Sequence, residues 1–103
     1  MIAEKFEAIV SLGIANSRMK DFFDLWVLLH DQTLNDDELR RAIEATFTRR
    51  ETALPAELPV GLSDAFATDP IKRTQWRAFL ERNGLEALDL RVVLKYVRVR
   101  LEA

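Results

Sequence analysis

The chain has 103 residues, of which 49% are hydrophobic and 31% charged, and its formal net charge is −2. This length and apolar content predict one domain with its own core, and the charge disfavours nonspecific nucleic-acid binding by the chain as a whole. The absence of cysteine and the single histidine exclude disulfides, thiolate metal sites and histidine-rich zinc sites.

The N-terminal third predicts two helices. Residues 2–13 place apolar side chains near helical spacing, and Gly13 is suited to end that helix. Asn16 and Ser17 are interpreted as the cap of a second helix over 18–30, whose apolar stripe leaves its charged residues on another face.

No window approaches the roughly 20 apolar residues of a membrane span, and no signal segment opens the chain, so we expect a cytoplasmic protein without membrane contact.

The middle of the chain predicts a third helix over residues 36–50, followed by a loop. The Asn35 side chain can accept from backbone N–H groups in the first turn, and the acidic residues that follow favour the positive helix end. Residues 51–63, here named the strap, contain Pro55 and Pro59, which disfavour a helix. The strap is also too apolar to stand clear of the body, so we expect it to lie across the helices.

Residues 64–68 predict a short helical turn, and Asp69-Pro70 then marks the start of a helix that ends near Gly84. The last segment, 89–103, fits two templates. Its β-branched residues, with alternation at 97–101, fit a strand, which would need a partner chain. Apolar residues also fall on one helical face, and we favour a helix because the chain offers no second strand.

These elements predict an all-α fold: a bundle of four to five helices with one long ordered Pro-containing loop, forming a single helical domain over residues 1–103. Residues 72–100 hold eight basic and three acidic side chains. Within them Arg91, Lys95 and Arg98 share one helical face. This stripe is interpreted either as a contact for RNA phosphates or as a solvated basic face.

A second polar pattern joins the first two predicted helices. Asp21 and Asp24 share a face, with Arg18 nearby, and such a cluster could hold phosphates and position a base or metal. The same residues also fit ordinary ion pairs on a solvated helix face. Lys5 lies about 12 Å along its helix from Gly13, so its side chain is expected to need a bent approach or a neighbouring domain to reach the two carboxylates.

Four stretches also resemble a known family: Ala3-Glu4-Lys5-Phe6-x-Ala8, Asn16-Ser17-Arg18-Met19-Lys20-Asp21-Phe22-x-Asp24-Leu25, Ala45-Thr46-Phe47-x-Arg49-Arg50-x-Thr52-x-Leu54-Pro55 and Trp76-x-x-Phe79-Leu80. They look like the C-terminal conserved block of the AbiEii/AbiGii nucleotidyltransferase toxins. These are the toxic half of bacterial type IV toxin–antitoxin and abortive-infection systems. The resemblance covers residues 3 to about 83 and continues more weakly beyond.

The resemblance implies a nucleotidyltransferase that uses a nucleoside triphosphate and a divalent metal such as Mg²⁺ to modify a target such as RNA. It implies that Lys5 and Asp21 are active-site residues. Glu4, Arg18 and Asp24 belong to the same conserved blocks. A lysine at this place could hold the triphosphate, and an aspartate could orient a phosphate-binding group or accept a proton.

The chain departs from the family in lacking its N-terminal catalytic core. That core begins with a Gly-rich segment and an Asp-x-Asp pair for the metals, whereas this sequence contains no Asp-x-Asp and its glycines stand singly. We therefore expect no metal site here, and we predict a C-terminal helical domain or truncated member that is inactive alone. Its expected partners are the missing core or a cognate antitoxin, with RNA or a second copy also considered. The alternative is a stand-alone helical module that binds a protein or itself without catalysis.

Overall fold

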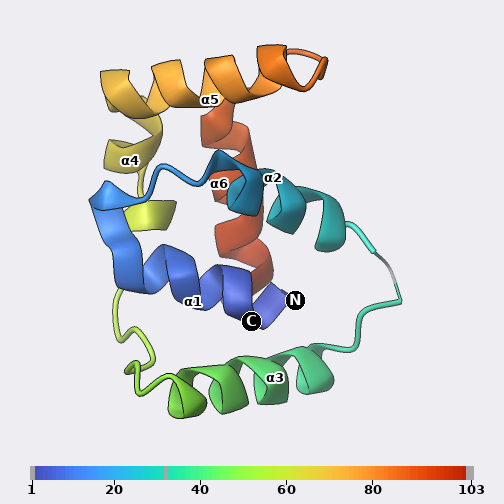
Figure 1. The fold of residues 1–103 in the computed structure, drawn as a ribbon. Coiled ribbons are helices and arrows are strands. Elements are labelled where there is room, and N and C mark those ends of the chain that lie inside the picture. The colour runs from blue at the N-terminus through green and yellow to red at the C-terminus, as the bar shows by residue number, and fades with distance from the viewer. Residues whose placement is uncertain (1, 32, 102–103) are drawn as a thin grey trace.

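The computed structural model describes residues 2–31 and 33–101. These residues form six α-helices and two 3-10 turns, with no strand among them (Figure 1). The predicted all-α class is confirmed, and the helices number six because residues 64–68 form a short helix of their own. In chain order the elements are α1 (Ile2–Leu12), η1 (Gly13–Ala15), α2 (Met19–Leu28), α3 (Asp36–Arg49), η2 (Val60–Leu62), α4 (Asp64–Thr68), α5 (Pro70–Arg82) and α6 (Leu90–Leu101).

Two of the predicted helix starts are formed by the expected side chains. The Asn35 side chain accepts from the backbone N–H groups two and three residues on, at 2.9 and 3.1 Å, and Asp69 does the same for α5 with Pro70 in the first turn. The last segment is a helix from 90 to 101, so the strand alternative is wrong for these residues. Positions 102 and 103 of that prediction lie outside the described residues.

The cap predicted at Asn16 and Ser17 is not formed. Arg18 occupies the cap position of α2, and its side chain makes no capping hydrogen bond to the helix. Asn16 lies too early in the chain for that role: it is buried, and its side chain instead accepts from the Arg18 backbone N–H at 2.8 Å. The buried Lys72 ammonium donates to the Asn16 backbone oxygen at 2.8 Å. Asn16 therefore fixes the turn between α1 and α2 onto α5.

The core is built around α6, which runs across α1, α2 and α5 in Figure 1 rather than alongside them. Its apolar face supplies Val93, Leu94 and Val97, all fully buried. The rings of Phe22 from α2 and Phe66 from α4 pack against each other with centroids 5.2 Å apart. Burial of such side chains stabilises the fold by roughly 1.5–3 kcal/mol each.

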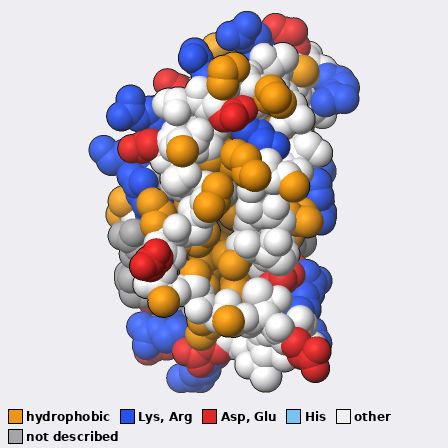
Figure 2. All heavy atoms as spheres, turned by 90° about the vertical axis from the view of Figure 1, so that its left-hand side faces the viewer, with side chains coloured by type: hydrophobic (Ala, Val, Ile, Leu, Met, Phe, Trp, Pro, Cys, Tyr) orange, Lys and Arg blue, Asp and Glu red, His pale blue; other side chains and the backbone are white. Residues whose placement is uncertain are grey.

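The strap is anchored at its C-terminal end. Leu62 is buried, and Gly61 passes so close to α1 that a Cβ there would lie 2.6 Å from Ile9 Cγ2 and 3.2 Å from the Ile9 backbone oxygen. The other large apolar side chains of the strap are exposed. The prediction that the strap lies across the helices thus holds for this contact with α1. Figure 2 shows apolar side chains along the middle of this face of the molecule and many charged ones toward its edges.

Two helices end in the same backbone motif with different residues at its key position. In α3 the Thr52 N–H donates to the Phe47 oxygen at 2.9 Å, and in α5 the Leu85 N–H donates to the Leu80 oxygen at 2.9 Å. This pairing needs a left-handed residue just after the helix, for which glycine is the usual choice. After α5 that residue is Gly84, with φ 63°, but after α3 it is Glu51, with φ 55°.

Candidate functional site

A charge cluster joins the first turn of α1 to the first half of α2. The Lys5 Nζ lies 3.3 Å from Asp21 Oδ1 and 2.9 Å from Asp24 Oδ2. The cluster is largely enclosed, since the exposed fraction of the side chain is 17% for Lys5 and 6% for Asp21. The structure therefore brings together the two residues predicted as catalytic and one of the supporting residues.

No neighbouring domain is needed for Lys5 to meet the two carboxylates, because it reaches both within the chain. The distance from Gly13 along α1 would matter if α2 began directly at the end of α1. Instead, η1 and residues 16–18 carry the chain back along α1, so that α2, which is antiparallel to α1, begins beside the N-terminal half of α1, as Figure 1 shows. The early turns of α2 consequently lie beside Lys5, and its side chain reaches both carboxylates directly.

Two more cations, Arg18 at the cap position of α2 and Lys20 within α2, complete the cluster at the three- and four-residue spacings of a helix face. Arg18 Nε lies 3.1 Å from Asp21 Oδ2, and Lys20 Nζ lies 2.7 Å from Asp24 Oδ2. Both cations are exposed, so each pair contributes about 0–1 kcal/mol. The two interpretations of these residues, as ion pairs on a solvated helix face and as a charge cluster, thus describe one arrangement. Lys5 extends it toward the protein interior.

The surroundings favour the charged forms of Lys5 and Asp24. Burial alone would lower the pKa of the Lys5 ammonium, but its hydrogen bonds to Asp24 and Asp21 outweigh burial and raise the pKa above its ordinary value of 10.5. Burial likewise would raise the pKa of Asp24, yet hydrogen bonds from Lys20 and Lys5 lower it below 3.8. At neutral pH Lys5 is therefore a fixed cation that can attract an anion but cannot serve as a base.

The structure contains a second, separate charge cluster that the sequence patterns above do not predict. Glu7, on α1, is buried, and its Oε1 accepts from Arg50 Nη1 at 2.7 Å while its Oε2 accepts from Thr52 Oγ1 at 3.0 Å. The Arg50 hydrogen bond lowers the pKa of Glu7 below its ordinary value of 4.5, against the effect of burial and with help from Thr52. The signal was present, because a carboxylate beside the apolar stripe of α1 needs a partner.

A hollow of about 480 Å³ opens beside the first cluster and also touches the second. Its lining consists of Glu4, Lys5, Ala8, Arg18, Asp21 and Arg50. Glu4, predicted as a supporting residue, has Arg49 Nη2 3.8 Å from its Oε1. Of the five residues that the family resemblance implies for the site, all except Asp24 thus line one hollow, and Arg50 joins them from the end of α3.

The carboxylates of this cluster do not fit a divalent metal as they are arranged. An ion bound between Asp21 and Asp24 would lie against the Lys5 ammonium, which already occupies that position. Among the described residues, no group of three or more His, Cys, Asp or Glu side chains is placed to hold a metal ion. The hollow suits a phosphate better, because three cations line it and charge-assisted hydrogen bonds to phosphate are strong.

The basic stripe on α6 is not uniform. Arg91 and Lys95 are exposed, whereas Arg98 is half-buried. Arg98 lines a hollow with Pro55, Pro59 and other residues of the strap. The role of this stripe in RNA contact stays a prediction.

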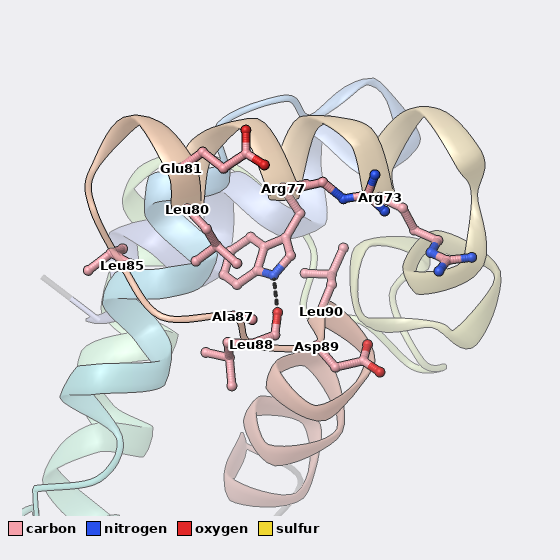
Figure 3. A pocket seen from close by; sticks show the side chains of 10 residues that line it. Arg73, Arg77, Leu80, Glu81, Leu85, Ala87, Leu88, Asp89 and Leu90 are labelled. Carbon is pink, nitrogen blue, oxygen red and sulfur yellow. Dashed lines mark hydrogen bonds between the residues drawn. The ribbon is translucent and has the colours of Figure 1, made fainter.

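A larger hollow, of about 540 Å³, lies between α5 and the start of α6 (Figure 3). Arg73 and Arg77 line one side of it, and the Trp76 indole N–H donates to the Leu88 backbone oxygen at 2.6 Å. None of the predicted site residues lines this hollow. We therefore place the candidate site at the Lys5 cluster.

No helix within residues 2–31 and 33–101 has both the length and the apolar character to cross a bilayer. The fold and the site together define a class: an all-α protein with a charge cluster suited to an anionic ligand. A family model described as nucleotidyl transferase AbiEii toxin, type IV TA system, matches residues 1–98. The chain belongs to this family, and the predicted resemblance is confirmed. Comparisons with curated proteins and with solved structures found no match.

Proposed function

We propose that this chain supplies the lysine-bearing helical part of a nucleotidyltransferase toxin. The complete protein would transfer a nucleotide from a nucleoside triphosphate to a target such as RNA. The observation that carries the proposal is the Lys5 ammonium, held within 3.3 Å of Asp21 and 2.9 Å of Asp24 in a chain that the family model matches over residues 1–98.

In this proposal Lys5 binds the triphosphate, and Asp21 and Asp24 orient it. The two carboxylates come from one helix and hold the ammonium before any ligand arrives, so its charge needs little reorganisation as the phosphates bind. Neutralising phosphate charge is a large part of catalysis in phosphate transfer. Because the metal does not fit between Asp21 and Asp24, its ligands would come from a catalytic core outside residues 1–103.

We expect the isolated chain to transfer no nucleotide. Incubation with Mg²⁺, each labelled nucleoside triphosphate in turn and total RNA should give no incorporation. Robust incorporation that Lys5→Ala abolishes would contradict this expectation. It would also show that the chain holds a complete site.

The mass of the native product in its own cells tests the link to a catalytic core. Blotting with an antibody against this chain should give a band well above 11.9 kDa, and the DNA upstream of Met1 should encode an in-frame Asp-x-Asp. A band near 11.9 kDa would contradict the proposal. We further propose that the protein acts in the cytoplasm and that its cognate antitoxin is a partner, as membership of a toxin–antitoxin family suggests.

A second candidate function is a helical module that binds a protein or itself without catalysis. The observation in its favour is the apolar face of Figure 2, on the side of the molecule where η1 and η2 meet. Ile14 in η1 and Val60 in η2 are both about half exposed. If this face self-associates, light scattering will show a concentration-dependent mass that Ile14→Ser with Val60→Ser abolishes. A monomer at every concentration would exclude self-association.

A further inference from the structure

Arg50 lines the hollow beside Lys5, although the two residues are far apart in the chain. It lies just after α3, and its side chain is 43% exposed. The bond to Glu7 uses one of the five N–H donors of a guanidinium. Arg50 therefore adds to the hollow a cation that is both anchored and accessible.

The anchoring comes from a buried carboxylate with both oxygens engaged. Glu7 receives Arg50 on one oxygen and the Thr52 hydroxyl on the other, and its side chain is 7% exposed. The left-handed residue Glu51 turns the chain between these two donors so that both can reach Glu7. A guanidinium held in this way loses less freedom on binding a ligand than an unattached one.

We infer that this hollow binds the polyphosphate group of a nucleotide, with Arg50 as a binding residue and with Glu7 and Thr52 as positioning residues that aim it. The inference rests on the proposed role of Lys5 as a phosphate-binding group. A guanidinium can donate two parallel hydrogen bonds to one phosphate, whereas an ammonium acts as a point charge, so Arg50 complements Lys5. Three cations and two carboxylates line the hollow, and Lys5 and Arg50 are also paired with Asp24 and Glu7. The N–H donors of Arg50 that Glu7 does not use are therefore what a phosphate would bind.

The neighbouring Arg49 provides a matched control. It has the same charge and adjoins Arg50 in the chain, but it is 63% exposed and does not line the hollow. We would titrate inorganic triphosphate into the full chain by calorimetry at low, fixed ionic strength. Arg50→Ala should weaken binding about 10-fold or more, as expected for hydrogen bonds between charged groups, while Arg49→Ala should weaken it less than about 3-fold.

Glu7→Gln separates positioning from net charge. The substitution removes a negative charge near the hollow, so simple electrostatic attraction predicts tighter triphosphate binding. If Glu7 instead positions the Arg50 guanidinium, its loss should weaken triphosphate binding by about 3-fold or more. Thr52→Val tests the same point with no change of charge and keeps the test valid if the Glu7 variant does not fold by circular dichroism. Tighter binding by a folded Glu7 variant, or unchanged binding by Thr52→Val, would overturn the positioning role.

The outcomes also separate this inference from the proposed function. Equal effects of Arg49→Ala and Arg50→Ala would overturn the inference, as would no binding of triphosphate by the unaltered chain. If Lys5→Ala abolishes binding while Arg50→Ala leaves it unchanged, the inference is wrong and the phosphate-binding role of Lys5 stands. The proposed function is judged independently, by the mass of the native product.

Discussion

Replacing Glu51 by glycine should make the protein more stable. Glu51 takes the left-handed conformation, φ 55°, at the point where α3 ends, and α5 ends on Gly84 with φ 63° in the same hydrogen-bonded motif. An L-residue in this region carries steric strain between its Cβ and the backbone, which glycine lacks. The Glu51 side chain is exposed, so its removal opens no cavity in the core.

The size of the effect follows from two opposing contributions. Relief of the left-handed strain is worth about 1–2 kcal/mol. Glycine also gives the unfolded chain more freedom, which costs about 0.4–1 kcal/mol. We therefore expect Glu51→Gly to raise the free energy of unfolding by about 0.5–1 kcal/mol, or the Tm by about 2–8 °C.

Urea unfolding at neutral pH, followed by circular dichroism, measures this change. Glu51→Ala removes the same carboxylate but keeps the strain, so it should stay within about 0.5 kcal/mol of the unaltered protein. Gly84→Ala should lose about 1 kcal/mol, and backbone strain would be the cause because a Cβ there meets nothing within 4 Å. A Glu51→Gly variant no more stable than Glu51→Ala would refute the reasoning.

Three further predictions concern packing, pH and the charge cluster. Gly61→Ala should destabilise the protein by about 1–3 kcal/mol through its clash with Ile9, and by less in an Ile9→Ala background. Equal losses in the two backgrounds of this double-mutant cycle would exclude the clash with the Ile9 side chain. Because the folded pKa of Glu7 lies below its ordinary 4.5, its contribution is present above that pH and is lost as the pH falls through the folded pKa. Glu7→Gln should thus be less stable at neutral pH and decline less steeply in acid, which unfolding across a series from about pH 7 to about pH 3 would show. Lys5→Met should lower the free energy of unfolding by about 1–3 kcal/mol, because Lys5 is enclosed between two carboxylates. Lys20 is 74% exposed, so Lys20→Met should lower it by only about 0–1 kcal/mol. Similar losses would contradict the enclosed position of Lys5.

The helix boundaries were predictable where the sequence contains strong local signals. Asn35 and Asp69-Pro70 act within a few residues of themselves, so their effects could be worked out without knowing the fold. Asn16 was misplaced because a polar residue before a helix can cap it or can fix the preceding turn. In the structure Asn16 is buried next to Lys72 and fixes the preceding turn, so it does not cap the helix.

The candidate site was only partly predictable for a related reason. The family resemblance singled out Lys5 and Asp21, and periodicity placed Asp21 and Asp24 on one face. Periodicity along one helix gives no information on how the next helix crosses it, so the direct contact of Lys5 was not foreseen. Glu7 and Arg50 are 43 residues apart in the chain, so local patterns could not pair them. Their contact also depends on the left-handed conformation of Glu51, which the residue type glutamate does not predict.

The way in which α3 is attached has a consequence for local opening of the protein. Its 14 residues pack against α1, as Figure 1 shows, and its buried side chains are Thr46 and Phe47. Leu39 and Ile43 also contact the core but are only half-buried. A helix with few fully buried side chains opens at a lower free energy than the core does, and its amide hydrogens exchange sooner. Arg50 and its bond to Glu7 close the C-terminal end of this segment. A ligand held by Arg50 would therefore slow exchange along the whole of α3, far beyond the atoms that it touches.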